Sequence, residues 1–120
     1  MPEQIGTTTM KAIAIASVAL GLMGPLATPS RAQQATEVQL TYAKGQFQPA
    51  EISAPADKPI AIRVKNLDAK AMEFESKSLR VEKVVAAGSE GVVNVRPLKP
   101  GRYEFYDDFN EKARGALVVQ

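Results

Sequence analysis

The chain has 120 residues, of which 23% are charged and 45% hydrophobic, so it is long enough for one globular domain and too short for two. Its formal charge is only +2 and its basic residues form no stripe, which argues against nucleic-acid binding. The chain contains no His and no Cys. This composition excludes a Ser–His or Cys–His nucleophile, and we expect that the protein is not an enzyme.

The N-terminal segment has the composition of a secretory leader. Residues 12–26 are uncharged, and Ser30 and Ala32 occupy the small-residue positions of a cleavage site. A membrane helix needs about 20 apolar residues, so an uncleaved anchor is the less favoured alternative. The sequence therefore predicts a signal peptide at residues 1–32 and a mature domain at residues 33–120, which is soluble in the periplasm.

After this segment, short runs of alternating apolar and polar residues are separated by turn residues, a pattern typical of β-strands. The predicted strands, in chain order, are VQLTY (38–42), FQPAEISAPA (47–56), IAIRVKN (60–66), MEFES (72–76), LRVEKVV (79–85), VVNVR (92–96), RYEFYD (102–107) and GALVVQ (115–120). Together they predict an all-β fold, an eight-stranded antiparallel β-sandwich with Greek-key connections. A small barrel is the alternative, and residues 110–114 are the one predicted helical turn.

The strand at residues 102–107 ends in a carboxylate that the period of two turns inward. Tyr103 and Phe105 occupy core positions, and Asp107 falls on the same face. An unpaired buried charge costs roughly several kcal/mol. We therefore expect Asp107 to have hydrogen-bond donors, a cation or water as its partner.

The run LKPGRYEFYDDFN (98–110) resembles the cupredoxin strand in which L-x-P-G-x-Y-x-F/Y-x-Cys leads to the copper-ligating Cys, with a His a few residues later. In that register Asp107 takes the Cys position. The wider set VKNLD, MEFES, VEKVV, PLKPGRYEFYDDF and G-x-L-V-V is more similar to small exported proteins related to the cupredoxin-like domain of periplasmic iron-uptake systems. In those proteins a His typically stands at the position of Asn110.

The resemblance implies a periplasmic sandwich that binds a transition metal, copper or iron, and assists metal uptake beside a membrane iron permease. A blue-copper site is excluded because it requires a thiolate and two imidazoles. The candidate metal ligands that remain near the implied site are Met72, Glu73, Glu75, Asp107 and Asn110, with Asp108 and Glu111 beside them. Carboxylates and an amide favour hard cations such as Mn²⁺, Ca²⁺ or ferric iron, and a thioether adds a preference for Cu(I). The resemblance thus implies a degenerate site that holds copper or iron weakly or not at all.

Each candidate also has a purely structural interpretation. Strand alternation places Glu73 and Glu75 on a solvated outer face, Met72 is a common core residue, and Asn110 is a good cap for a helical turn. The alternative hypothesis for function follows from these interpretations. It is a metal-free β-sandwich that serves as an interaction module for a membrane iron permease or oxidase.

Overall fold

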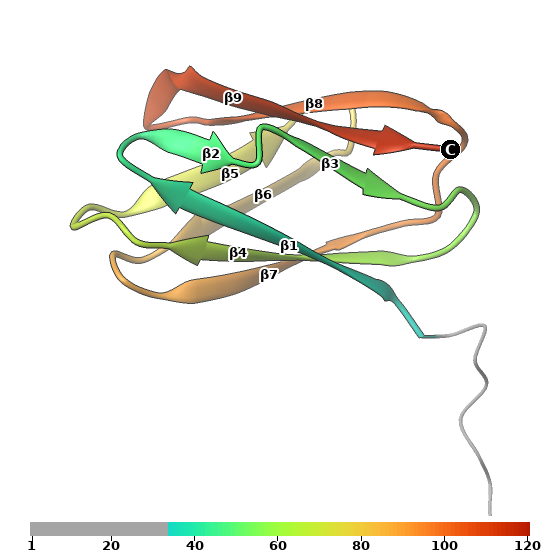
Figure 1. The fold of residues 1–120 in the computed structure, drawn as a ribbon, viewed down its shortest axis with the longest axis horizontal. Coiled ribbons are helices and arrows are strands. Elements are labelled where there is room, and N and C mark those ends of the chain that lie inside the picture. The colour runs from blue at the N-terminus through green and yellow to red at the C-terminus, as the bar shows by residue number, and fades with distance from the viewer. Residues whose placement is uncertain (1–33) are drawn as a thin grey trace, which may run out of the picture.

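The computed structural model describes residues 34–120, which form a sandwich of two β-sheets (Figure 1). The predicted leader lies outside these residues and stays a prediction. The strands of the described part are β1 (Thr36–Ala43), β2 (Gln46–Gln48), β3 (Glu51–Ala54), β4 (Ile60–Asn66), β5 (Met72–Ser76), β6 (Val81–Val85), β7 (Glu90–Val95), β8 (Gly101–Asp107) and β9 (Asn110–Val119). Within residues 34–120, no helix is long and apolar enough to cross a membrane.

The first sheet has the strand order β2-β1-β4-β7 and the second the order β3-β9-β8-β5-β6. The two sheets are the two layers of Figure 1, with β8 and β9 in one and β4 and β7 in the other. Most neighbours are antiparallel, but β1 pairs with β4 and β3 with β9 in parallel. The predicted all-β sandwich is confirmed. The described residues form nine strands where eight were predicted, and the predicted antiparallel pairing does not hold for the β1–β4 and β3–β9 pairs.

The additional strand arises because the predicted strand at residues 47–56 is split in two. Pro49 separates β2 from β3, and a proline has no backbone N–H with which to continue a hydrogen-bond ladder. β2 pairs with β1 in the first sheet, and β3 pairs with β9 in the second. The chain therefore passes from one sheet to the other at this proline.

The predicted helical turn at residues 110–114 was wrong, because these residues begin β9. Asp107 pairs directly with Asn110, so Asp108 and Phe109 form the tip of a β8–β9 hairpin. A segment of five residues cannot nucleate a stable helix by itself, and the pairing with β8 decides its conformation. The side chain of Asn110 consequently caps no helix.

Aromatic rings fill the core at the end of the sandwich that carries the β8–β9 turn. The rings of Phe74 and Phe105 stack with their centroids 4.8 Å apart, and Phe47 meets Phe105 edge-on at 5.0 Å. Tyr42 continues this cluster, with its ring 5.1 Å from that of Phe47. This packing brings the phenol of Tyr42, on β1, next to the last residue of β8.

Candidate functional site

The buried carboxylate at the end of β8 is held by three hydrogen bonds. Asp107 is 2% exposed. Its Oδ2 accepts from the Tyr42 hydroxyl at 2.6 Å, and its Oδ1 accepts from the backbone N–H groups of Glu73 at 2.9 Å and Phe109 at 3.0 Å. The expectation of an inward carboxylate with hydrogen-bond donors is confirmed. These donors compensate its burial without a cation.

The phenol that donates to Asp107 is itself buried, at 4% exposure. Burial and the hydrogen bond to Asp107 together raise the pKa of Tyr42 to about 12, although the side chain of Asn110 acts in the opposite direction. Tyr42 is therefore a protonated donor at neutral pH.

A hollow of about 520 Å³ lies beside this pair at the end of the sandwich. Its lining includes Tyr42, Asp107 and Asn110 together with Asp68 of the β4–β5 loop. The carboxylate of Asp68 accepts hydrogen bonds from the backbone N–H groups of Lys44 and Gly45, at 2.6 and 2.9 Å. Asp68 is thus used to hold the β1–β2 turn.

Met72 lies in the hydrophobic core at 0% exposure and is not part of the lining of this hollow. Its position at the start of β5 gives it the inward orientation that the period of two predicts. The structural interpretation of Met72 as a core residue matches this placement. An ion that enters from solvent has no path to its thioether without a rearrangement of the core.

Three carboxylates gather on the opposite, outer face of the second sheet. Glu73 and Glu75 of β5 and Asp108 of the β8–β9 turn each offer an oxygen, and these oxygens lie within 4.8 Å of one another. We call this group the outer acidic cluster. Glu75 also faces Glu82 across the β5–β6 pair, so like charges stand directly opposite each other, which is destabilising.

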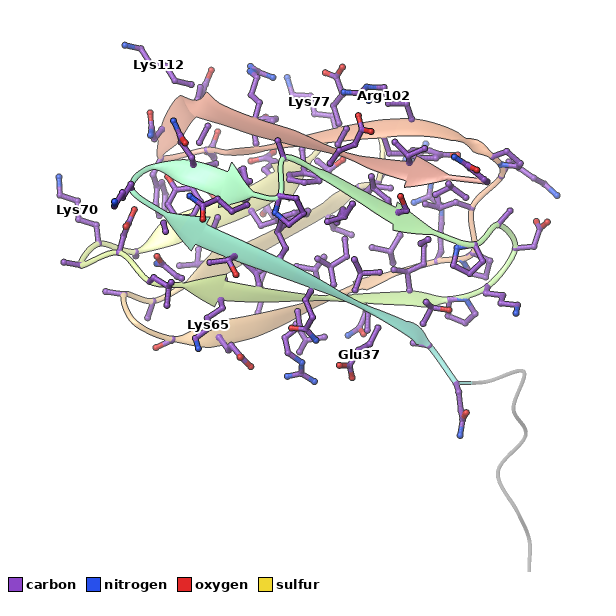
Figure 2. All side chains as sticks on the ribbon, in the orientation of Figure 1. Glu37, Lys65, Lys70, Lys77, Arg102 and Lys112 are labelled. Atoms are coloured by element: carbon purple, nitrogen blue, oxygen red, sulfur yellow. The ribbon has the colours of Figure 1, made fainter. Side chains whose placement is uncertain are left out.

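The charges of the outer acidic cluster perturb one another. Partial burial raises the pKa of Glu73 and of Glu75, and the carboxylates of Glu82 and Asp108 raise both pKa values further. Lys77 lowers the pKa of Glu75 against this trend. Figure 2 shows Lys77 and Arg102 directed outward from this sheet. Because like charges raise the pKa values of Glu73 and Glu75, protons or a bound cation would relieve the repulsion among the carboxylates of the cluster.

The five predicted ligands accordingly fall in three places. Met72 is in the core, Glu73 and Glu75 are on the outer face, and Asp107 and Asn110 both line the hollow. Whether any of them binds a metal stays a prediction. The sequence did not indicate Tyr42, because its contact with Asp107 joins residues far apart in the chain and leaves no local pattern.

The donor set does not fit blue copper. The chain has neither the thiolate nor the imidazoles of such a site, and the residue at the implied thiolate position, Asp107, has both oxygens in hydrogen bonds. The outer acidic cluster offers oxygen ligands, which suit a hard cation. Two oxygens on opposite sides of an ion the size of Ca²⁺, each at roughly 2.3–2.6 Å, lie about 5 Å apart, so the spacing of the cluster is compatible with one such ion.

Comparisons with known proteins agree with this architecture. Residues 14–119 match the family described as "Cupredoxin-like domain". An uncharacterised protein of Rickettsia prowazekii (strain Madrid E) is 34% identical over 84 residues, which are 69% of this chain and 67% of that protein.

Solved structures with the same fold include several copper proteins. The metal-binding domain of the Streptococcus pneumoniae D39 Cu(I)-exporting P-type ATPase CopA, solved with Cu(I), is 20% identical, with a TM-score of 0.59 over 78% of this chain and 92% of that one. Auracyanin B is 18% identical, with a TM-score of 0.60 over 72% and 89% of the two chains. Auracyanin of Roseiflexus castenholzii is 13% identical, with a TM-score of 0.58 over 72% and 98%. At these identities the likeness shows the fold alone.

Proposed function

The chain belongs to the family of cupredoxin-like domains, and from this premise we propose that it is an exported, metal-binding accessory protein of copper or iron uptake. It holds its ion with carboxylates on the outer face of the second sheet. In this proposal the mature domain is soluble in the periplasm, has no enzymatic activity and passes its ion toward a membrane iron permease.

The convergence of Glu73, Glu75 and Asp108 carries the proposal. Carboxylate oxygens favour hard ions, so this cluster suits ferric iron and Mn²⁺ better than Cu(I). Binding is weak because Glu73 and Glu75 are only half-buried and Asp108 is exposed, so water competes for the ion. Weak binding suits a protein that delivers a metal, since the ion must also leave.

The proposal is tested by calorimetric titration of the full chain with Mn²⁺ and with Cu²⁺ in a competing buffer. We expect micromolar or weaker affinity for both ions. Glu75→Gln should weaken Mn²⁺ binding by at least about tenfold, because affinity at oxygen sites follows the number of charged ligands. The matched control is Glu104→Gln, which removes another exposed carboxylate of this sheet outside the cluster. Sub-micromolar copper binding, or equal Mn²⁺ affinity in all three proteins, would contradict the proposal.

A second candidate function is the metal-free interaction module that partners a membrane iron permease or oxidase. It is favoured by two exposed apolar side chains, Leu67 at 56% and Phe109 at 58%, in the β4–β5 loop and the β8–β9 turn. If this function is correct, Phe109→Ser abolishes co-purification with a membrane iron permease. Val84→Ser, which changes an exposed apolar residue of β6, leaves co-purification intact. Retention of the permease by Phe109→Ser would rule this candidate out.

A further inference from the structure

We infer that Tyr42 and Asp107 form a metal-independent clamp that joins the two sheets, at the end of the sandwich where the family resemblance places a metal-ligating residue. A hydrogen-bond network thus holds this position in place of an ion. The inference does not depend on cation binding by the outer acidic cluster, which lies on the other face of the second sheet.

The clamp connects strands of different sheets. Tyr42 belongs to β1 in the first sheet and Asp107 to β8 in the second, and their hydrogen bond of 2.6 Å is buried. The edge-on contact between the rings of Tyr42 and Phe47 joins two strands of the same sheet, so it does not replace this hydrogen bond between the sheets. A short bond between a phenol and a carboxylate is of the strong, charge-assisted kind, so it fixes the distance between the sheets at this end.

The other carboxylate oxygen holds the β8–β9 turn and β5. The bond from the N–H of Phe109 to Oδ1 spans two residues and is an Asx-turn, which shapes the hairpin tip. The bond from the N–H of Glu73 ties the same oxygen to β5, and the N–H of Asp108 donates to the carbonyl of Glu73 at 2.9 Å. One carboxylate therefore positions a turn, a neighbouring strand and the opposite sheet.

The three donors occupy both lone pairs of Oδ1 and one of Oδ2, so an ion at Asp107 either uses the single lone pair that remains on Oδ2 or displaces one of these donors. The displaced N–H or O–H group would then be buried without a partner, which is unfavourable. Neither a thiolate nor an imidazole is present in the chain to compensate that loss. The clamp consequently leaves a metal at most one lone pair of Asp107 and keeps this end of the sandwich ordered without an ion.

Thermal unfolding of the full chain tests the clamp, with EDTA or Cu²⁺ added in parallel samples. Tyr42→Phe removes one donor without changing the ring, and we expect it to lower the Tm by about 10 °C. The matched control, Tyr103→Phe, removes an exposed hydroxyl that donates to the carbonyl of Lys99, and its Tm should stay within about 3 °C of the wild type. Neither EDTA nor Cu²⁺ should change the difference between the wild type and Tyr42→Phe.

Amide hydrogen exchange provides a second readout that does not require large destabilisation. In the metal-free wild type the amides of Glu73 and Phe109 should exchange slowly, and in Asp107→Asn they should exchange at least about tenfold faster. The double variant Tyr42→Phe/Asp107→Asn should lose less Tm than the two single variants combined, because both act on one bond. A Tm difference between the wild type and Tyr42→Phe that disappears with EDTA, amides protected only with Cu²⁺, or additive Tm losses would overturn the inference.

Discussion

Alkaline pH should weaken the Tyr42–Asp107 clamp by an amount that the structure sets. Burial and Asp107 raise the pKa of Tyr42 from 10.0 to about 12 in the folded protein, and Asp68 acts in the same direction. A pKa that is higher in the folded state contributes stability that is fully present below pH 10 and is lost as the pH rises toward about 12. Because each pKa unit corresponds to about 1.4 kcal/mol, the loss is at most about 2.7 kcal/mol.

The assay is urea unfolding of the wild type and Tyr42→Phe at about pH 8 and about pH 12, with the two proteins compared at each pH. All other ionisable groups are common to the two proteins, so the comparison cancels their contribution. At about pH 8 the wild type should be more stable by about 2 kcal/mol, the value of a hydrogen bond to a charged group. By about pH 12 this difference should approach zero. A difference that stays constant between the two pH values would refute the reasoning.

Three further predictions concern the acidic cluster, the core and the end of the sandwich. Glu75→Gln should raise the free energy of unfolding at neutral pH without metal, because partial burial and neighbouring like charges disfavour the ionised Glu75 and raise its pKa. For the same reason the wild type should gain stability as the pH falls through that raised pKa. A Glu75→Gln protein that is less stable than the wild type in urea unfolding would contradict this. Gly115→Ala should lower the free energy of unfolding by about 3 kcal/mol in the same assay, because the added Cβ would lie 2.5 Å from the Phe105 ring and 2.7 Å from the Ala50 carbonyl oxygen. The control is Gly101→Ala, whose Cβ would have its nearest contact at 3.6 Å, and it should lower the free energy of unfolding by less than about 1 kcal/mol. Asn110→His should bind copper no tighter than the wild type in calorimetry, since Asp107 remains engaged by its donors, and a gain to sub-micromolar affinity would show that a metal site is still in place.

Strand alternation made most of the fold predictable from local sequence. The inward positions of β4, β5 and β8 follow from the period of two, and the residues predicted inward on β5 and β8, such as Phe74 and Phe105, are buried. The split at Pro49 also had a local signal, the missing N–H of proline, which indicates a strand boundary. The conformation of residues 110–114 had none, because it depends on pairing with β8.

The candidate site was less predictable because its contacts are long-range. Alternation indicated that Glu73 and Glu75 lie opposite Met72, yet the approach of Asp108 depends on the β8–β9 turn and on the register shift between Tyr106 and Asp107. The bond from Tyr42 to Asp107 depends on the packing of one sheet on the other. A pattern within single strands does not encode either contact.

The central claim is that an ion binds the outer acidic cluster and not the interior of the sandwich. The most direct measurement is the Mn²⁺ affinity of the full chain, determined by competition, for the wild type, Glu75→Gln and Tyr42→Phe. We predict a loss of at least about tenfold for Glu75→Gln and no change for Tyr42→Phe. A loss of affinity in Tyr42→Phe together with unchanged affinity in Glu75→Gln would place the ion at Asp107 and contradict the claim.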